Sequence, residues 1–446
     1  MALVQSFSGI RGIYDEDMTE QVAAKYAYSY QKLKNPKKIV IGTDTRQSRD
    51  TLKNAVLEAL DCNVIDIGIA STPMTEFAVR HFKADGGIII TASHNEPYWN
   101  GFKFLDKDGA VLRPEDMEKV IKTYNEINKI NNIKTKKVIK KYDEINQAYQ
   151  DYILNFLSEE EKNKIKNSKL KIIIDPNGGT GIIAKEILKK LNVTVHGINM
   201  KYGFFNRTVE PNEESLIYLA NIVREKKYDF AAGFDCDADR IEIVTDKSLV
   251  SGNKLLALIA DDILKTAKNK AIVVNDATSG VVKEIAKQHN AKYIETQVGE
   301  INVVDKMYEL KAPVGGEGSS SGIIIPDSRC RDGILTLIYL LKIISNKNIN
   351  DLIKKLPEYY NIKTKVNIDS KKYGKIKENL KIHYIKKNYK IKESGQSGSL
   401  KIYLNDNEYI WFRESKTEAN VLRVISDSPN KKKAESMIKE ALDLIK

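Results

Sequence analysis

The chain contains, at Gly86–Asn95, the stretch GGIIITASHN, in which small and β-branched residues give way to polar ones. An unbroken apolar run of this kind is typical of a strand that is buried on both faces of an α/β sheet. Ligands of such sheets bind at the carboxyl edge, where the strand delivers Thr91 to Asn95. The stretch therefore predicts an α/β fold that presents Ser93 at a ligand-binding edge. A serine after a strand is more often a loop or capping residue, so this interpretation depends on the motifs that follow.

A second strand-like run, Asp229–Phe234, leads into the sequence DCDADR at Asp235–Arg240. Carboxylates at a spacing of two residues lie on one side of an extended chain, with their Cα atoms about 6–7 Å apart, and a curl of the loop would let them converge on one cation. Oxygen ligands suit Mg²⁺, which takes few protein ligands and leaves positions for phosphate oxygens. The alternative is a solvated acidic turn. The predicted ligands are Asp235, Asp237 and Asp239.

Two later loops carry groups that suit a phosphorylated sugar. At Gly315–Gly322 the chain reads GGEGSSSG, and its carboxylate and hydroxyls match adjacent sugar hydroxyls. At Arg413–Glu418 it reads RESKTE, with Arg423 beyond, and guanidinium groups, hydroxyls and loop N–H groups match a phosphate dianion. Each loop alone is compatible with an ordinary surface turn. Together with the serine and the acidic loop, they predict a site for a sugar phosphate.

These four motifs follow one another in the order found in the α-D-phosphohexomutases, the family of phosphoglucomutase, phosphomannomutase and phosphoglucosamine mutase. The chain resembles that family over essentially its whole length. The shorter stretches that add to the resemblance are Ser8–Gly12 (SGIRG), Gly42–Ser48 (GTDTRQS), Asn100–Lys103 (NGFK) and Thr296–Glu300 (TQVGE). The resemblance implies an intramolecular phosphotransferase of the isomerase class. Such an enzyme interconverts hexose 1-phosphate and hexose 6-phosphate through a phosphoserine enzyme and a bisphosphorylated sugar.

The resemblance also implies a role for each site residue. Ser93 would carry the phosphoryl group and, as phosphoserine, help to bind one Mg²⁺ per active site together with Asp235, Asp237 and Asp239. The residues implied near the phosphoserine are Arg11, Lys103 and Arg240, with Lys103 also a candidate proton shuttle. The residues implied in sugar recognition are Glu317, Ser319 and Glu300. The residues implied in holding the phosphate that does not react are Arg413, Ser415, Thr417 and Arg423.

Departures from the family pattern bear on the identity of the sugar. In many relatives the loop that corresponds to Gly315–Gly322 ends with Gly-His, where this chain has Ser320 and Ser321. Many glucose and mannose enzymes have His at the position of Glu300. An acidic residue at this position resembles many phosphoglucosamine mutases, and a carboxylate facing the sugar's C2 would favour an ammonium group. The resemblance therefore leans to phosphoglucosamine mutase, with phosphomannomutase or phosphoglucomutase as the alternative. The phosphate loop also has Lys416 where Gly or Asn is usual and Ala419 where Pro is usual.

Two other chemistries would use the same residues differently. A Ser-His-Asp hydrolase would pair Ser93 with His94, but adjacent residues of an extended chain point in opposite directions, and the Gly-x-Ser-x-Gly elbow is missing. A phosphatase could use Asp235 as its nucleophile, which leaves the serine, sugar and phosphate loops without a role. Neither alternative accounts for all four motifs.

The composition predicts a soluble enzyme of several domains. The chain has 446 residues, 42% hydrophobic and 30% charged, with no apolar run long enough for a membrane span and no signal-peptide pattern at Met1–Gln5. Three cysteines, without metal-ligand spacing, favour reduced thiols and a cytoplasmic location. The net charge of +12 raises nucleic-acid binding as an alternative, but solvated lysines and an anionic substrate explain it more simply. We expect a small-molecule sugar phosphate as partner, neither nucleic acid nor membrane, and a monomer or homodimer.

Repeated strand–helix–strand patterns predict the fold class: α/β, with three related α/β domains whose sheets are mixed and parallel-rich, plus a small C-terminal α+β domain. The predicted domains are 1–141 (phosphoserine), 142–247 (metal), 248–358 (sugar recognition) and 359–446 (phosphate). A polar connector, Asn128–Lys141, marks the first boundary. We expect the last domain to swing as a lid about Lys355–Asn361.

Overall fold

The computed structural model describes residues 3–127, 137–318, 321–394, 398–415 and 420–445. Its contacts divide the chain into two compact units. The first comprises Met1–Ser251 and Ser321–Asp351, and the second comprises Gly252–Ser320 and Leu352–Lys446. Each unit is described below by itself.

The first sheet of the first unit has seven strands in the order β1-β2-β6-β5-β3-β4-β7. The strands are β1 (Val4–Ser6), β2 (Gly9–Ile13), β6 (Trp99–Asp106), β5 (Gly86–Ile90), β3 (Lys38–Thr43), β4 (Asn63–Ile69) and β7 (Lys137–Lys140). Strands β5, β3, β4 and β7 pair in parallel, whereas β6, β2 and β1 pair antiparallel. The sheet is therefore mixed, as predicted, and β5 is an inner strand. The end of the predicted polar connector is in fact the edge strand β7, and residues 128–136 lie outside the described residues.

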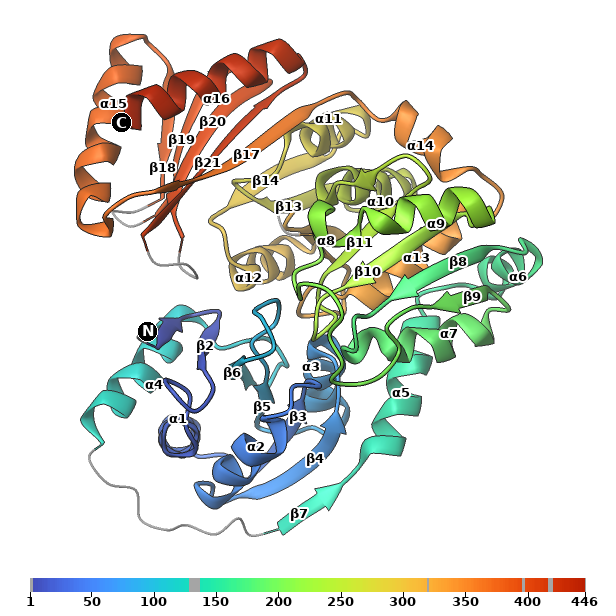
Figure 1. The fold of residues 1–446 in the computed structure, drawn as a ribbon, viewed down its shortest axis with the longest axis vertical. Helices are drawn as coiled ribbons and strands as arrows, with labels where there is room; N and C mark the ends of the chain where they lie inside the picture. Colours follow the sequence, from blue (N-terminus) through green and yellow to red (C-terminus); the bar gives the residue numbers. More distant parts are fainter. Residues whose placement is uncertain (1–2, 128–136, 319–320, 395–397, 416–419, 446) are drawn as a thin grey trace. The chain divides into compact units, whose positions relative to one another are not determined.

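Helices cover both faces of this sheet. Helices α1 (Glu20–Lys34), α2 (Arg49–Glu58) and α4 (Pro114–Glu126) pack on one face around a common apolar core, and α3 (Thr72–His81) packs on the other (Figure 1). Helix α3 begins where it does because Ser71 accepts a hydrogen bond from the N–H of Met74 and Pro73 occupies its first turn. This start places Thr72 beside the carboxyl edge of the sheet, close to Asp237.

The second sheet of the first unit has the order β12-β11-β10-β8-β9. Its strands are β8 (Lys171–Asp175), β9 (Thr194–Gly197), β10 (Phe230–Phe234), β11 (Ile241–Val244) and β12 (Leu249–Val250). Strand β10 pairs in parallel with β8 and antiparallel with β11, so the chain reverses directly after Phe234. The helices of this part are α5 (Tyr142–Leu154), α6 (Glu159–Asn167), the 3-10 helix η1 (Thr180–Ile183), α7 (Ala184–Lys190), α8 (Glu213–Leu216) and α9 (Tyr218–Lys226).

A later segment of the chain completes the first unit. It contains β16 (Ile323–Ile324) and α13 (Gly333–Ile344), and α14 (Ile349–Lys355) contains the point at which the chain passes into the second unit. Helix α13 is apolar nearly all round and packs against α5, α6 and β11. A helix that is apolar on every side must be buried, which explains why it lies inside the first unit.

The second unit holds two sheets. In the first of them β14 (Lys292–Thr296), β13 (Ala271–Asn275) and β15 (Val314–Gly316) pair in parallel, accompanied by α10 (Gly252–Thr266), α11 (Gly280–Gln288) and α12 (Glu300–Leu310). The other sheet is antiparallel in the order β17-β21-β20-β19-β18. Its elements are β17 (Tyr360–Asn367), η2 (Ser370–Lys372), α15 (Tyr373–Lys386), β18 (Lys390–Glu393), β19 (Leu400–Asn405), β20 (Glu408–Glu414), β21 (Val421–Ser428) and α16 (Lys431–Ile445). Helices α15 and α16 cover one face of it (Figure 1).

The opposite face of the antiparallel sheet packs on the end of β13. Lys401 Nζ donates to the carbonyl oxygen of Asp276 at 2.8 Å and lies 2.7 Å from Glu295 Oε1, and Trp411 Nε1 donates to Asp276 Oδ1 at 3.1 Å. These contacts join the sheet to β13–β15 in one compact unit. Buried polar groups therefore lie between the C-terminal sheet and its neighbour in the second unit, and the expected swing of the last domain about Lys355–Asn361 stays a prediction.

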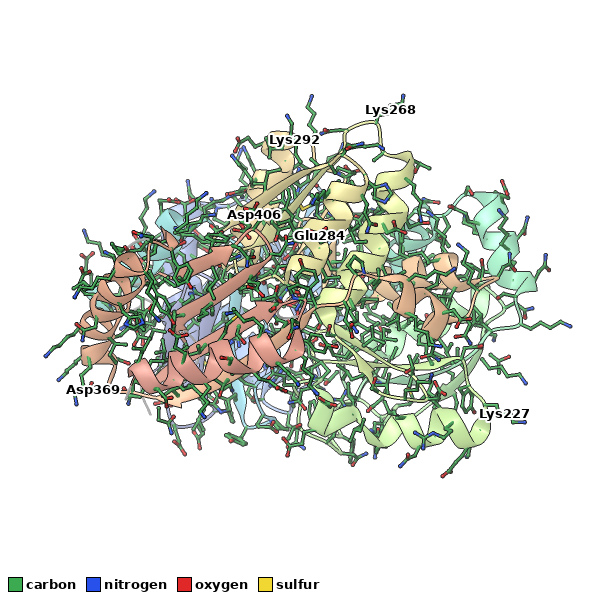
Figure 2. The ribbon with its side chains drawn as sticks, turned by 90° about the horizontal axis from the view of Figure 1, so that it is seen from above. Lys227, Lys268, Glu284, Lys292, Asp369 and Asp406 are labelled. Carbon is green, nitrogen blue, oxygen red and sulfur yellow. The ribbon has the colours of Figure 1, made fainter. Side chains whose placement is uncertain are left out.

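The fold class is confirmed: three sheets with parallel strands, and a fourth that is antiparallel. The predicted domain boundaries stay a prediction. Among the described helices, none is long and apolar enough to cross a membrane. Lysines at the ends of elements, such as Lys227, Lys268 and Lys292, extend outward from the ribbon (Figure 2), which is the arrangement of solvated charges.

Candidate active site

Ser93 lies in a tight turn just beyond the end of β5. Its φ of +50° is in the left-handed region, which is uncommon for a residue with a side chain. The turn is held by the Ser93 N–H, which donates to Thr91 Oγ1 at 2.8 Å, and by Arg46, whose Nη2 donates to the Ser93 carbonyl at 3.0 Å. The hydroxyl of Ser93 donates to Asp235 Oδ2 at 3.1 Å. Ser93 is at the predicted sheet edge, but it is covered, with 1% of its surface exposed.

The three predicted metal ligands follow β10 and are completely buried. One carboxylate oxygen from each of Asp235, Asp237 and Asp239 lies within 4.8 Å of the other two. The curl that brings them together includes Ala238, whose φ of +54° is again left-handed. Asp237 Oδ1 and Asp239 Oδ1 are buried and accept no hydrogen bond. Unpartnered buried carboxylate oxygens are costly, so this donor set fits a small, hard divalent cation.

The other oxygens of two of these carboxylates contact cationic side chains. Lys103, on β6, places Nζ 2.8 Å from Asp237 Oδ2 and 2.9 Å from Asp239 Oδ2. Arg331 Nη2 lies 3.2 Å from the same Asp239 Oδ2. Thr72 Oγ1 donates to Asp237 Oδ2 at 2.6 Å. The Oδ2 side of the cluster is thus neutralised by close contacts with protein groups, whereas on the Oδ1 side Arg240 Nε lies 3.9 Å from Asp239 Oδ1 and makes no hydrogen bond to it.

Burial and neighbouring charges shift the pKa values of the three carboxyl groups in different directions. Burial by itself raises the pKa of Asp239, but the charges of Arg331 and Lys103 outweigh burial and lower the pKa well below its ordinary value. The pKa of Asp237 is also lowered, because the Lys103 ammonium outweighs burial. Asp235 has its pKa raised well above the ordinary value by burial and by the neighbouring charges of Asp237 and Asp239. Asp235, the partner of Ser93, thus differs from Asp237 and Asp239, whose charges Lys103 compensates at close range.

Two more predicted residues lie at this cluster. Arg11, on β2, donates through Nη1 to Asn95 Oδ1 at 2.8 Å, and burial followed by the charge of Arg240 lowers its pKa to about 10. The N–H of Arg240 donates to Asp235 Oδ1 at 3.2 Å, and its guanidinium lies 3.1 Å from Glu210. The first unit thus brings together Ser93, Arg11, Lys103, Arg240 and the three aspartates.

The sugar-loop carboxylate, Glu317, lies in the second unit just after β15. Its Oε1 accepts hydrogen bonds from Asn275 Nδ2 and from the N–H of Gly299, both at 2.9 Å. Glu300 is the first residue of α12, in the loop that donates through Gly299. Glu317 is therefore held in one orientation by groups at the carboxyl ends of β13 and β14. The predicted Ser319 lies outside the described residues.

The two arginines predicted to bind phosphate face each other across β20 and β21, since Arg413 and Arg423 are direct register partners. Like charges directly opposite in a sheet are destabilising, and an anion between them would remove the repulsion. Burial lowers the pKa of Arg413, which also lies near the charges of Asp276 and Glu317. The N–H of Ser415 donates to the Val421 carbonyl at 2.7 Å, which closes the base of this loop. Thr417 lies outside the described residues.

Four contributors were missed from the sequence. Arg46 belongs to the stretch Gly42–Ser48, which predicts no role for it, yet it is fully buried and holds the Ser93 turn. Thr72, Arg331 and Asn275 were not singled out. Only the cap pattern before α3 could have drawn attention to Thr72. Nothing in the local sequence connects Arg331 with Asp239, because the two are 92 residues apart.

A serine hydroxyl against a carboxylate cluster, with cations around it, is what metal-assisted phosphoryl transfer to and from a serine requires. The chain matches the family models of phosphoglucomutase/phosphomannomutase α/β/α domains I, II and III at residues 4–131, 147–248 and 251–360. It therefore belongs to the phosphoglucomutase/phosphomannomutase family, whose members are phosphohexomutases. This confirms the resemblance seen in the sequence.

Individual relatives agree with this assignment over the full length. A phosphoglucomutase/phosphomannomutase of Thermococcus kodakarensis is 31% identical, with 98% of this chain and 97% of the relative covered. A phosphoglucosamine mutase of Caldanaerobacter subterraneus subsp. tengcongensis is also 31% identical, with the same coverage of the two chains. Among solved structures, a phosphoglucomutase/phosphomannomutase family protein of Burkholderia thailandensis aligns with a TM-score of 0.85 at 20% identity, covering 99% of this chain and 97% of that one.

Proposed function

We propose that this phosphohexomutase interconverts hexose 1-phosphate and hexose 6-phosphate through a phosphoserine at Ser93 and a bisphosphorylated sugar, with glucosamine phosphate as its preferred substrate. The observation that carries the proposal is the contact of Ser93 Oγ with Asp235 Oδ2 at 3.1 Å, beside two buried carboxylate oxygens that accept no hydrogen bond. A hydroxyl in that position can carry a phosphoryl group whose charge the site is built to neutralise.

The donor set supports Mg²⁺ as the ion held by Asp235, Asp237 and Asp239, because all ligands are hard oxygens and two of them are unpartnered. When bound, Mg²⁺ would neutralise negative charge on the phosphoserine. The side chains that would add positive charge there are Arg11, Lys103 and Arg240. Charge neutralisation and positioning supply most of the catalysis in phosphoryl transfer.

In the first half-reaction a sugar hydroxyl oxygen attacks the phosphorus of the phosphoserine, and the bond from phosphorus to the Ser93 oxygen breaks. In the second half-reaction the Ser93 oxygen attacks the phosphorus of the other sugar phosphate, and the bond from that phosphorus to the sugar oxygen breaks. One proton passes from the attacking sugar hydroxyl to the Ser93 oxygen in the first half-reaction, and one passes from the Ser93 hydroxyl to the sugar oxygen in the second. We assign the relay of each proton to Lys103, which gives a proton to the leaving oxygen and takes one from the attacking hydroxyl. The bisphosphorylated sugar then presents its other phosphate to Ser93, so the reaction returns the phosphoserine and releases the isomer.

The second unit would recognise the rest of the substrate. Glu317, fixed by Asn275 and Gly299, would accept hydrogen bonds from two sugar hydroxyls, and Ser319 would add to this contact. Arg413 and Arg423 would bind the phosphate that does not react, assisted by Ser415 and Thr417. Since either phosphate of the bisphosphorylated sugar must use these arginines in turn, the site serves both directions of the reaction.

The preference for glucosamine rests on Glu300 and on the relatives that are named phosphoglucosamine mutases. A carboxylate near the sugar's C2 would pair with an ammonium group and has no such partner in glucose or mannose. The alternative is a phosphomannomutase or phosphoglucomutase, as in the Thermococcus relative.

A coupled assay of the purified protein with glucosamine, mannose and glucose 1-phosphates tests this proposal. We expect the highest kcat/KM with glucosamine 1-phosphate. Glu300→Gln should reduce that preference, whereas the matched variant Glu309→Gln, at the other end of α12, should not. Equal or better turnover of mannose or glucose phosphate by the unmodified protein would refute the glucosamine assignment. Absence of mutase activity with all three sugars would refute the proposed function.

A further inference from the structure

Arg331 contacts the acidic cluster from a part of the chain that no motif singled out. Its Nη2 lies 3.2 Å from Asp239 Oδ2, and 9% of its side chain and 1% of that of Asp239 are exposed. The partner residue is 92 positions away in the sequence, so the contact depends on the tertiary fold and not on local structure. A buried arginine needs a well-placed partner for its charge, and the partner of Arg331 is Asp239, one of the predicted metal ligands.

The backbone around Arg331 is hydrogen-bonded to the loop Asp235–Arg240 and packs closely against it. The N–H of Gly333 donates to the Ala238 carbonyl at 3.1 Å. A Cβ at Gly333 would lie 2.8 Å from the Arg240 carbonyl oxygen, and one at Gly322 would lie 2.9 Å from that of Asp239. Only glycine permits two approaches this close. The segment that carries the Arg331 guanidinium therefore packs closely against Ala238–Arg240.

Arg331 contacts only one of the two carboxylate oxygens of Asp239, and the choice of oxygen bears on metal binding. Arg331 and Lys103 both bind Oδ2 of Asp239, while Oδ1 of the same carboxylate accepts no hydrogen bond. The cationic group that faces Oδ1 is Arg240 Nε, at 3.9 Å and without a hydrogen bond, so the two close cationic contacts are both on Oδ2, where they do not compete with a metal ion for Oδ1. The contact compensates the charge of the carboxylate and leaves its other oxygen available.

We propose that Arg331 is a positioning residue of the catalytic centre, which orients Asp239 through Oδ2 and compensates charge so that an anionic phosphate can approach. The proposal rests on the proposed function, because it assigns Asp239 to a divalent cation and the neighbouring site to a phosphate. Removing the guanidinium would leave the cluster more negative. A divalent cation should then bind more tightly and a sugar phosphate more weakly, and these opposite changes distinguish charge compensation from a structural role.

The test uses the full-length protein and three variants. Arg331→Gln keeps a hydrogen-bond donor for Asp239 without the charge, and Arg331→Lys keeps the charge. Tyr149→Phe is the matched control, since it removes the 2.7 Å hydrogen bond to Asp332 in the same segment but no charge near the cluster. Mn²⁺ binding without substrate is measured by titration calorimetry, and KM for glucosamine 1-phosphate by the coupled assay.

We expect Arg331→Gln to bind Mn²⁺ about threefold to tenfold more tightly and to raise KM by a similar factor. Arg331→Lys and Tyr149→Phe should stay within about twofold of the unmodified protein on both readouts. Mn²⁺ affinity of Arg331→Gln that is unchanged or weaker would overturn the proposal. Should that variant not fold, Arg331→Met, which retains most of the side-chain length without the charge, is read by the same criterion.

The Mn²⁺ measurement does not depend on turnover, so the two proposals fail separately. Mutase activity with an unchanged Mn²⁺ affinity in Arg331→Gln would remove only the role of Arg331. Tighter Mn²⁺ binding in that variant, in a protein that does not turn over any hexose phosphate, would support the charge role and refute the proposed function.

Discussion

The buried carboxyl group of Asp332 allows a quantitative test of how much free energy a buried charge costs in this part of the first unit. It is the capping residue of α13, where its Oδ1 accepts from the N–H of Leu335 at 2.9 Å and its Oδ2 accepts from the Tyr149 hydroxyl at 2.7 Å. Burial raises the pKa of Asp332 to about 6 from an ordinary value of 3.8. Asp332→Asn keeps the shape and an excellent capping side chain but carries no charge at any pH.

The sign of the effect follows from proton binding. Between about pH 4 and pH 6 the folded state holds the Asp332 proton more tightly than the unfolded state does, so stability falls as the pH rises through this window. Above it the cost of the buried charge is fully present, at most about 3 kcal/mol for a shift of about two pKa units. We expect Asp332→Asn to match the unmodified protein near pH 4 and to exceed it in stability by up to that amount at pH 7–8.

Urea unfolding at a series of pH values measures this difference. The matched control is Asp369→Asn, which alters an exposed aspartate that caps η2 (Figure 2) and should change stability by less than about 0.5 kcal/mol at every pH. A constant difference between Asp332→Asn and the unmodified protein across the series would refute the reasoning. So would a variant that is less stable at pH 8.

Three other substitutions probe the second unit. Lys401→Met removes the buried ammonium from Glu295, which keeps only the more exposed Lys392 at 3.6 Å, and should lower the free energy of unfolding by about 3 kcal/mol; a loss under about 1 kcal/mol in urea unfolding would contradict the docking role of this pair. Asn275→Ala removes one hydrogen-bond donor to Glu317 and should raise KM for the sugar phosphate about tenfold, without altering the Mn²⁺ affinity measured by calorimetry. An unchanged KM would show that Asn275 has no role in substrate binding. Arg423→Ala should raise KM for both the 1-phosphate and the 6-phosphate while the requirement for Mg²⁺ stays the same; an effect on one isomer only would contradict alternate use of this site.

The residues that could be predicted from the sequence are those whose chemistry is local. Ser93 and the carboxylates of Asp235–Asp239 follow apolar runs that identify inner strands, and the structure has those runs as β5 and β10. The strand periods and the order of the elements were enough for the fold class. The site residues that could be predicted from a local sequence pattern are therefore those that directly follow the ends of inner strands.

The remainder depends on long-range packing. Lys401 and Tyr403 alternate with Leu400 and Ile402 along β19, a pattern that predicts a solvated face, yet Lys401 is buried against Glu295. The packing of the C-terminal sheet on the end of β13 through Lys401 therefore had no signal in the sequence. Arg331 likewise has no local signal, because its role depends on a carboxylate from another sheet.

The most direct test of the central claim is the mass of the protein and the location of any phosphate on it. Purified protein treated with glucose 1,6-bisphosphate should gain the mass of one phosphate group, and peptide mapping should place that group on Ser93, next to the carboxylate of Asp235. Ser93→Ala should gain no phosphate and should lose mutase activity while remaining folded. Phosphate on another residue, or full activity in Ser93→Ala, would contradict the phosphoserine mechanism.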